Sequence, residues 1–390
     1  MKNKLRENKY LVRELSAKAQ HEGRAAGLPD RPTEGIIPGS VAPAPRPQLP
    51  TEIAPPNPLL RSSLRCWLLT DGKIGDEVQC LGIAEALGVA NELRHVAPRP
   101  AYAWAMPYGP IDPRESPGQL GSPLTPPYPD LAIAAGRRAV PYLRMLKRAS
   151  KGTTFTIFVK DPYWSRRRMD LIIVPEHDRL AGKNVFATLT PAHRLHAWRL
   201  AAARDTADRR VAHLPRPRVA LILGGTSQHH RFADKDIEAL AWIAASIALQ
   251  GKGLMVTPSR RTPPELRDAI AKVLAGLRQD LAKNVFLWDG TGTNPYVVIL
   301  AHADSIIVTG DSVNMVGEAV ATGAPVHVYE PSGGHRKIST YLARLEALGA
   351  IRRWRGDLED WCYEPINATP LIAEEIARRF RDFLEKRSAG

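Results

Sequence analysis

Short apolar runs alternate with longer amphipathic stretches along the chain from residue 65 onward. The runs are rich in aliphatic and β-branched residues, which is typical of buried parallel strands. The amphipathic stretches carry apolar residues at helical spacing, as at Val313, Val316 and Val320, and therefore predict helices. Strands that alternate with helices in this way predict parallel sheets built from β–α–β units.

The expected strands cover residues 65–70, 91–97, 130–134, 154–159, 171–174, 219–223, 253–256, 285–288, 305–309 and 325–329. A Pro-Arg-Pro step at 215–217 separates them into two groups, and each group opens with a strand, a glycine loop and a helix. The fold class that follows is α/β, with two Rossmann-like domains. We assign them to residues 65–215 and 216–365, and a last helix with one apolar face to residues 366–390.

Two proline-rich segments interrupt this pattern. Residues 1–60 hold ten prolines and few large apolar residues, so we expect residues 1–64 to be a disordered extension without catalytic chemistry. Residues 98–129 hold another ten prolines and predict an irregular insertion.

The net charge indicates which partners the protein could bind, and the cysteine content indicates the compartment in which it works. The formal net charge is +14, which favours anionic partners such as nucleotides or phosphorylated substrates. Three cysteines form neither an even framework nor a CxxC pair, which indicates a reducing compartment and argues against structural zinc. No apolar run reaches the roughly 18–20 residues that span a bilayer, and the N-terminus lacks the apolar core of a secretory signal. We expect a cytoplasmic protein. The charged N-terminus is either a dispensable tail or an amphipathic helix in peripheral contact with the inner face of a membrane.

The first glycine loop follows the strand at 65–70 and contains Asp71, Gly72, Lys73 and Gly75. It does not match the GxGxxG fingerprint of dinucleotide-binding domains. Its glycines still allow backbone N–H groups at a helix start to approach an anion, with Lys73 adding positive charge. A plain structural turn is the alternative interpretation.

In the second domain three loops at strand ends carry polar groups. The loop after 219–223 contains Gly224, Gly225 and Ser227, and the loop after 253–256 contains Ser259, Arg260 and Arg261. Two guanidiniums at this position suit a diphosphate, because Arg can bind phosphate oxygens through two hydrogen bonds, although a solvated basic turn has the same sequence. We also predict that Thr262 caps the next helix in a capping box with Glu265.

The third loop joins the strand at 305–309 to the next helix. Asp311 and Ser312 are good helix starters, and Asn314 and Glu318 lie one above the other on that helix. Ligands bind at the carboxyl ends of strands in open α/β sheets, so these four residues are candidates for a binding site. The alternative is that they only cap and solvate the helix. Glu176, His177 and Asp178 are adjacent in sequence and cannot all face one ion, so we expect no metal site.

Several motifs resemble the mitochondrial fission family named for the plant elongated-mitochondria (ELM) protein. The resemblance covers about residues 65–365 and rests on Thr70-Asp71-Gly72-Lys73, Pro175-Glu176-His177-Asp178, Gly224-Gly225, Ser259-Arg260-Arg261-Thr262-Pro263, Asn294-Pro295-Tyr296 and Val308-Thr309-Gly310-Asp311-Ser312-Val313-Asn314-Met315. The sequence departs from the expected pattern near Val78, where the resemblance implies an amide, and near Gly310, where it implies a polar or acidic residue.

The resemblance implies the architecture of a GT-B glycosyltransferase. In such enzymes two Rossmann-like domains face each other across a cleft, and a final helix commonly crosses back to the first domain. The second domain would bind a nucleotide-sugar donor, which is a co-substrate, so we expect no cofactor. Residues that would hold it are Gly224, Gly225, Ser227, Ser259, Arg260, Arg261, Asp311, Ser312, Asn314 and Glu318. Glu318 would accept hydrogen bonds from the donor ribose, and Arg260 would neutralise the diphosphate in place of a metal ion.

The resemblance places acceptor chemistry on the first domain. Asp71 or Asp161 would be the catalytic base, while Gly72, Lys73 and Gly75 would contact an anion. The expected function is metal-independent glycosyl transfer from a nucleotide-sugar to a cell-envelope or lipid-linked glycan. The alternative is a non-catalytic recruitment factor of the fission type on the same scaffold. We expect no nucleic-acid partner, because no recognised nucleic-acid fold motif or aromatic stacking platform accompanies the basic residues.

Overall fold

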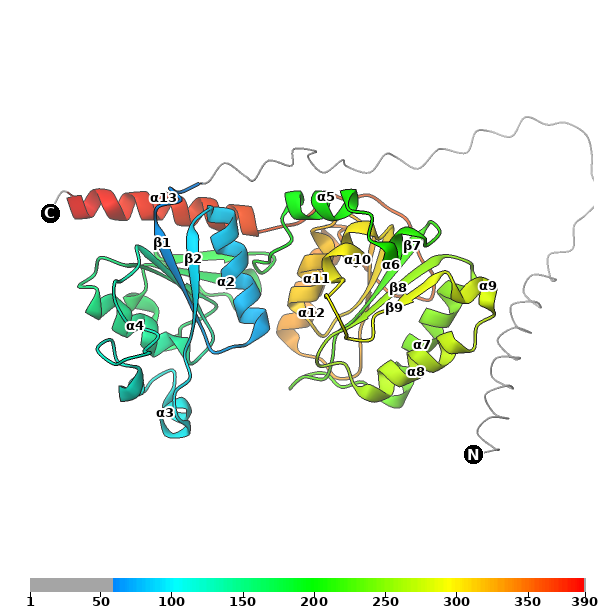
Figure 1. Cartoon of the computed structure of the whole chain (residues 1–390), viewed down its shortest axis with the longest axis horizontal. Coiled ribbons are helices and arrows are strands. Elements are labelled where there is room, and N and C mark those ends of the chain that lie inside the picture. The colour runs from blue at the N-terminus through cyan, green and yellow to red at the C-terminus, as the bar shows by residue number, and fades with distance from the viewer. Residues whose placement is uncertain (1–58, 389–390) are drawn as a thin grey trace, which may run out of the picture.

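A computed structural model of the chain describes residues 59–388, so most of the predicted extension lies outside the described residues. The described part forms two α/β domains, each built on a six-stranded parallel sheet (Figure 1). Leu60 is buried in the first domain and its N–H donates to the carbonyl of Leu87, so the first domain includes residues before the predicted boundary at 65.

The first sheet has the strand order β2-β1-β3-β4-β5-β6, with every neighbouring pair parallel. Its strands are β1 (Arg65–Thr70), β2 (Ala90–His95), β3 (Leu131–Ala135), β4 (Phe155–Val159), β5 (Leu171–Pro175) and β6 (Val185–Thr188). The accompanying helices are α2 (Ile74–Leu87), α3 (Pro100–Ala105) and α4 (Ala139–Ala149), with single turns η1 (Pro113–Glu115), η2 (Tyr163–Arg168) and η3 (Glu176–Asp178). The predicted irregular insertion therefore contains one short helix, α3, and one turn, η1.

The second sheet has the order β12-β11-β10-β7-β8-β9, again with parallel neighbours. Its strands are β7 (Arg218–Leu223), β8 (Gly253–Pro258), β9 (Val285–Leu287), β10 (Ser305–Thr309), β11 (Val326–Tyr329) and β12 (Ile351–Arg353). Its helices are α5 (Ala197–Asp205), α6 (Arg209–Ala212), α7 (Asp234–Leu249), α8 (Pro264–Ala275), α9 (Gln279–Ala282), α10 (Tyr296–His302), α11 (Val313–Val320) and α12 (Arg336–Ala347). Counted from β7, this is the Rossmann strand order 3-2-1-4-5-6 read from the opposite edge. The prediction of two Rossmann-like domains is confirmed.

Both faces of each sheet are covered, which explains why the strands read as continuous apolar runs. In the first sheet, alternate residues such as Leu68 and Ile133 face α2, while Leu69 and Ala134 face α4. In the second sheet, one face packs on α10, α11 and α12 and the other on α7 and α8. Residues that alternate along a strand therefore enter different cores, and the four cores fix both sheets.

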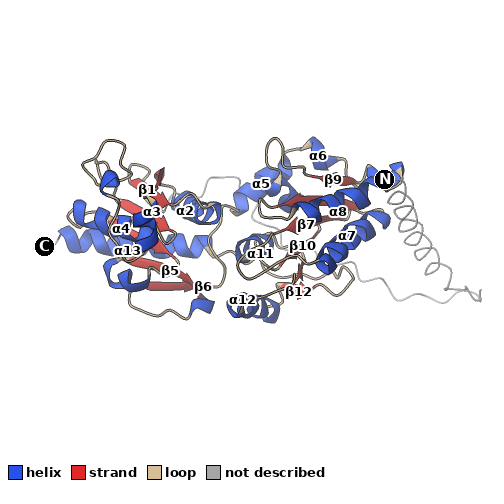
Figure 2. Ribbon diagram, turned by 90° about the horizontal axis from the view of Figure 1, so that it is seen from below, coloured by secondary structure: helices blue, strands red, loops and turns tan. Residues whose placement is uncertain are grey.

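Two connections link the domains near one edge (Figures 1 and 2). The crossing region belongs to the second domain, because Leu200 of α5, Val211 of α6 and Leu214 are buried in its core. The boundary that we predicted at residue 215 is therefore too late in the chain. The last helix, α13 (Thr369–Ser388), returns to the first domain, where Ile372 and Phe380 are buried beside α2 and the sheet.

The strand order gives the topological switch point of each sheet, which is the place where the chain stops adding strands on one side and starts on the other. In the first sheet this switch point lies between β1 and β3, which places Asp71 and Gly136 side by side. In the second sheet it lies between β7 and β10, which places Gly224 beside Asp311. Ligands of open α/β sheets bind in the crevice outside such points. No helix within residues 59–388 is long and apolar enough to cross a membrane.

Candidate functional site

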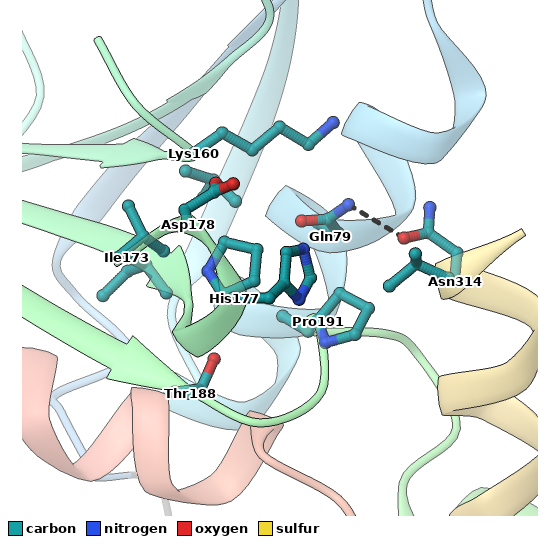
Figure 3. Close-up of a pocket in the computed structure, with 13 residues that line it drawn as sticks. Gln79, Lys160, Ile173, His177, Asp178, Thr188, Pro191 and Asn314 are labelled. Carbon is teal, nitrogen blue, oxygen red and sulfur yellow. Dashed lines mark hydrogen bonds between the residues drawn. The ribbon is translucent and has the colours of Figure 1, made fainter. Parts of the chain in front are cut away.

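The helices that follow the two switch points meet end to end between the domains. Gln79 of α2 donates a hydrogen bond from Nε2 to Oδ1 of Asn314 on α11, at 3.3 Å (Figure 3). Gly75, in the first turn of α2, lies so close that a Cβ there would stand 2.9 Å from Nδ2 of Asn314. A helix N-terminus carries partial positive charge, which Asp76 and Glu77 offset in the first turn of α2. The first turn of α11 has no acidic residue, so the α11 side of the junction is the side attractive to an anion.

A pocket of about 260 Å³ opens beside this junction and takes side chains from both domains. Its lining residues are Gln79, Val159, Lys160, Ile173, Val174, Pro175, His177, Asp178, Thr188, Pro191, Ala192, Val313 and Asn314. Figure 3 shows Lys160, Gln79 and Asn314 along one side of the pocket, with His177 between Gln79 and Ile173. Asn314 is the only predicted site residue in this lining, so the pocket adds groups that sequence reasoning missed.

The first-domain side of the junction holds two buried carboxylates. The Asp71 side chain is 2% exposed, with Oδ2 3.1 Å from Nζ of Lys73 and Oδ1 buried without a hydrogen-bond partner in the described chain. A Cβ on Gly136 would stand 3.1 Å from both Oδ1 of Asp71 and Oδ2 of Asp76, so the two carboxylates converge there. Asp76 is neutralised by an ion pair with Lys160. One oxygen of Asp71 is therefore held by Lys73, while the other has no hydrogen-bond partner among the described residues.

Asp161, the other candidate base, is already occupied. Both of its oxygens accept hydrogen bonds from the Arg166 guanidinium, at 2.8 and 2.6 Å, and Oδ1 also accepts from the N–H of Tyr163. These hydrogen bonds lower the pKa of Asp161, chiefly that from Arg166. A carboxylate held in this way is a weak proton acceptor, so Asp161 is placed to shape the turn η2.

The position of Lys160 depends on an unusual backbone conformation. Its φ angle is +82°, a region that residues with a side chain rarely adopt. Such strained residues cluster at functional sites, where the surrounding structure holds them in place. At the end of β4 this conformation lets the ammonium reach Asp76 and line the pocket.

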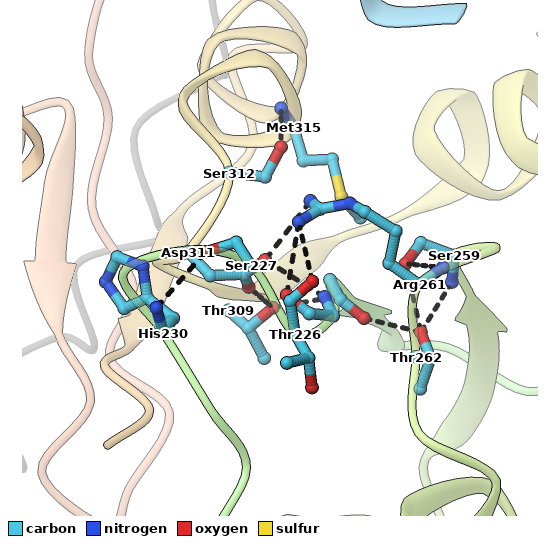
Figure 4. Close-up of polar contacts among 12 residues, drawn as sticks. Thr226, Ser227, His230, Ser259, Arg261, Thr262, Thr309, Asp311, Ser312 and Met315 are labelled. Carbon is cyan, nitrogen blue, oxygen red and sulfur yellow. Dashed lines mark hydrogen bonds and ion pairs between the residues drawn. The ribbon is translucent and has the colours of Figure 1, made fainter. Parts of the chain in front are cut away.

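The predicted glycine loop of the second domain is built around Asp311. The Asp311 carboxylate is fully buried and accepts hydrogen bonds from the Gly225 N–H at 2.9 Å and the Thr309 hydroxyl at 2.7 Å (Figure 4). Thr309 in turn accepts from the Gly224 N–H. The Arg261 guanidinium lies 3.4 Å from Asp311 and donates to the carbonyls of the same loop. These backbone N–H groups are therefore used inside the loop and are not available to a phosphate.

Three further predicted residues also build loops. Ser259 Oγ accepts from the N–H of Arg261 at 3.2 Å, and Ser227 Oγ accepts from the N–H of His230 at 3.1 Å. The prediction that Thr262 caps α8 is wrong, since the helix begins at Pro264 without a side-chain cap. The Thr262 hydroxyl instead donates toward the carbonyls of Leu223 and Gly224, which ties the Ser259 loop to the glycine loop.

The groups left open toward a ligand lie at the start of α11. Ser312 is the N-cap, and its Oγ accepts from the N–H of Met315 at 3.4 Å. The first N–H groups of a helix have no partner within it, so those of Val313 and Asn314 point out of the helix end. Arg260 is exposed, and Lys73 is 66% exposed across the junction. These groups supply donors and positive charge without an acidic residue in the first turn of α11.

Glu318 lies one turn further along α11. One of its carboxylate oxygens accepts a hydrogen bond from the Tyr296 hydroxyl at 2.7 Å. Burial raises the pKa of Glu318 to about 7, while the hydrogen bond from Tyr296 opposes the rise. The carboxylate thus has one oxygen held by Tyr296 and changes charge near neutral pH.

His177 and Asp178 connect the domains on the other side of the pocket. Asp178 forms an ion pair with Lys337 of α12 at 2.6 Å, and the His177 ring stands 5.8 Å from that of Tyr341. Burial lowers the pKa of His177, which favours the neutral ring. No group of three or more His, Cys, Asp or Glu residues in the described part of the chain is arranged to hold a metal ion.

Gln79, Lys160 and His177 were not among the predicted site residues, although the loops of Lys160 and His177 follow predicted strands. Gln79 and His177 meet the second domain, whereas Lys160 is held by Asp76 of its own domain. One signal was available for Gln79, since an amide was expected near Val78 and Gln79 is the next residue. The positive φ of Lys160 leaves no mark in the sequence.

Residues 74–380 match the family described as Mitochondrial fission ELM1. Mitochondrial fission protein ELM1 of Arabidopsis thaliana is 26% identical over 276 residues, which cover 64% of this chain and 64% of that protein. The chain thus spans slightly less than two thirds of the length of that relative. An uncharacterized protein of Rickettsia prowazekii (strain Madrid E) is 23% identical over 359 residues, or 80% of this chain and 98% of that protein.

Among solved structures, the chain is similar to UDP-GlcNAc 2-epimerase from Methanocaldococcus jannaschii. The TM-score is 0.49 and the sequence identity 12%, over 82% of this chain and 100% of that chain.

Proposed function

The chain belongs to the mitochondrial fission ELM1 family, and on that premise we propose that it is a metal-independent glycosyltransferase with a nucleotide-sugar donor. Its acceptor is a cell-envelope or lipid-linked glycan, and it works in the cytoplasm. The observation that carries the proposal is the meeting of the α2 and α11 N-termini between the two switch points. That junction provides positive charge for a diphosphate on one side and a buried carboxylate on the other.

On the donor side, the start of α11 supplies the diphosphate site. The N–H groups of Val313 and Asn314 would bind phosphate oxygens, and the exposed Arg260 would add charge without a metal ion. The loop-building network of Gly224, Gly225 and Asp311 holds this helix start in a fixed position. Glu318 would accept hydrogen bonds from the donor ribose through the oxygen that Tyr296 leaves open.

On the acceptor side, Asp71 is the proposed catalytic base. The acceptor hydroxyl oxygen forms a bond to the anomeric carbon, the bond from that carbon to the diphosphate breaks, and the hydroxyl proton passes to Oδ1 of Asp71. The nucleoside diphosphate leaves with the electron pair, and its charge is stabilised at the α11 N-terminus. A single displacement of this kind inverts the configuration of the sugar. Nζ of Lys73 lies 3.1 Å from Oδ2 of Asp71, so Oδ2 is held by an ion pair and Oδ1 is the oxygen proposed to take the proton.

A thermal-shift screen with nucleotide-sugars tests the proposal. A nucleotide-sugar that binds should raise the unfolding temperature in a saturable way, since a ligand that binds only the folded state stabilises it. Arg260→Ala should weaken binding by roughly tenfold through loss of one charge-assisted contact, and Glu318→Ala should weaken it through loss of the ribose contact. Arg278→Ala, an exposed arginine of the same domain near α9, is the matched control and should bind as wild type. Absence of binding at millimolar nucleotide-sugar would rule the proposal out.

Glu318→Gln should change the pH dependence of stability. The folded pKa of Glu318, about 7, is above the ordinary value of 4.5, so the folded state binds the proton more tightly than the unfolded state. The free energy of unfolding of the wild type should therefore fall as pH rises from about 4.5 to 7, by at most about 3 kcal/mol. Glu318→Gln should remove that fall, and urea unfolding at pH 5 and pH 8 measures it. Parallel curves for the two proteins would contradict the shifted pKa.

The family description also favours a second candidate function, non-catalytic recruitment on the same scaffold. Under that function the interdomain surfaces bind a protein partner, and glycosyl transfer plays no part. Deletion of the gene followed by complementation separates the two. Complementation by Asp71→Asn and Glu318→Ala variants at wild-type abundance would favour recruitment, whereas its failure with both would favour catalysis.

A further inference from the structure

Four large aromatic side chains of the first domain are exposed on neighbouring turns. They form what we term the aromatic patch: Trp104 (85% exposed), Tyr108 (56%), Tyr163 (44%) and Trp164 (88%). The Tyr108 ring centroid lies 5.2 Å from that of Trp164 and 6.2 Å from that of Tyr163. These residues come from the end of α3 and from η2, so the fold and not the sequence brings them together.

Arginines surround the aromatic patch and hold part of it in place. Arg137 donates to the carbonyl of Ala103 at 3.3 Å, and Arg144 donates to the carbonyl of Gly109 at 3.0 Å. These two bonds fix the turn that carries Trp104 and Tyr108. Arg167 and Arg168 stand in η2 with Trp164, while Arg138 is the N-cap of α4 and Arg148 lies in its last turn.

The positive charge of this region is largely uncompensated. Arg166 is paired with Asp161, but Arg137, Arg138, Arg144, Arg148, Arg167 and Arg168 form no ion pair within residues 59–388. Arg168 and Arg148 lie near enough to Arg144 to lower its pKa, after the larger effect of burial. A cluster of like charges that lacks internal counter-ions is stabilised by an external anion.

We propose that the aromatic patch and these arginines dock the first domain on an anionic lipid bilayer. Trp and Tyr side chains settle at the headgroup level of membranes, because their rings are apolar and their tips polar. Arginines beside them pair with lipid phosphates. The four side chains are exposed and do not line the interdomain pocket. An exposed surface of this kind can lie on a flat lipid bilayer.

The geometry of the rings argues against single-stranded nucleic acid as the partner. Bases stack on open, parallel ring faces. Here Tyr108 stands at 64° to Tyr163 and 55° to Trp164, so neighbouring rings cover part of each other's faces. The positive charge could bind either single-stranded nucleic acid or an anionic bilayer. The ring geometry favours the bilayer.

Docking by this surface would orient the junction between the domains relative to the bilayer. This consequence rests on the proposed function, glycosyl transfer to a lipid-linked acceptor. α3 follows β2 and η2 follows β4, so the patch lies at the same sheet edge as Asp71, which follows β1. Figure 1 shows α3 protruding on the side of the first domain opposite α13. A bilayer at this edge would bring a lipid-linked acceptor to the first-domain side of the junction.

Sedimentation of the full-length protein with lipid vesicles tests the docking. We expect binding to phosphatidylcholine vesicles that contain phosphatidylglycerol and little binding to phosphatidylcholine alone. The double variant Arg167→Gln/Arg168→Gln should bind anionic vesicles about thirtyfold more weakly. The double variant Trp104→Ala/Trp164→Ala should lose a comparable factor. Trp242→Ala, an exposed tryptophan of α7 in the second domain, is the matched control and should bind as wild type.

Wild-type binding by both double variants would overturn the docking proposal, as would equal binding to neutral and anionic vesicles. Loss of binding to poly(U) RNA in the variants, with vesicle binding unchanged, would instead identify a nucleic-acid surface. Thermal shift with the nucleotide-sugar is measured on the same preparations and should be unchanged, since the substituted side chains are exposed and lie outside the junction. A protein that binds vesicles through the patch but binds no nucleotide-sugar would refute glycosyl transfer alone.

Discussion

Asp71→Asn is expected to lower the rate of glycosyl transfer by about 10²–10⁴-fold while the affinity for the nucleotide-sugar stays as in the wild type. The amide keeps the shape of the side chain but cannot accept the proton of the acceptor hydroxyl. Oδ1 of Asp71 is buried and has no partner in the described chain, so it is free for that proton, whereas donor contacts come from the other domain. Initial rates with a saturating donor, together with the dissociation constant of the donor, measure the two effects.

Asp161→Asn is the matched control for this substitution. Its carboxylate already accepts two hydrogen bonds from Arg166, so its loss should disturb η2 and reduce transfer far less. A larger loss of rate in Asp161→Asn than in Asp71→Asn would reverse the assignment of the base.

Gly225→Ala is expected to destabilise the second domain by about 3 kcal/mol. A Cβ at this position would overlap the backbone carbonyl of Arg261. The loops that carry Gly225 and Arg261 are both held by hydrogen bonds. The Gly225 N–H is bonded to the buried Asp311, and the Arg261 carbonyl accepts from the N–H of Thr226 at 3.2 Å. Urea unfolding followed by circular dichroism should show a lower midpoint, and nucleotide binding should weaken with it because α11 loses its anchor.

Gly118→Ala provides the comparison for an ordinary glycine. No atom lies within 4 Å of a Cβ built there, so the substitution should leave the midpoint unchanged. If Gly225→Ala were as stable as Gly118→Ala, the close packing of the switch-point loops would not be essential to the fold.

The strands were predictable because burial on both faces imposes an apolar run that sequence displays directly. The run at 305–309 coincides with β10, and that at 130–134 is displaced from β3 by one residue. The edge strands β6 (Val185–Thr188) and β12 (Ile351–Arg353) were not predicted; both are short and β12 carries two arginines in three residues. The edge strand β9 (Val285–Leu287) is as short but wholly apolar in sequence, and it was predicted.

The site was less predictable, because its chemistry depends on which groups remain free after folding. Asp311, Gly224 and Arg261 have the residue types of a phosphate site, yet in the fold they bond mainly to one another. Thr262 has the spacing of a helix cap, but a nearby pair of carbonyls competes for its hydroxyl. Whether a polar group faces a ligand or its neighbours is decided by strand order, which local sequence does not determine.

The sequence also gave no means of choosing between Asp71 and Asp161. The choice depends on two contacts of the folded chain. Gly136, which follows β3, packs against the Asp71 carboxylate, and Arg166 donates hydrogen bonds to the Asp161 carboxylate. Neither contact can be read from the sequence.

The N-terminus of α11, which faces α2 across the domain junction, is the proposed diphosphate site. A crystal of the full-length protein soaked with a nucleoside diphosphate tests it directly. We expect diphosphate density within hydrogen-bond distance of the N–H groups of Val313 and Asn314, with the Arg260 side chain turned toward it. Diphosphate bound elsewhere on the molecule, or no bound nucleotide at millimolar concentration, would contradict it.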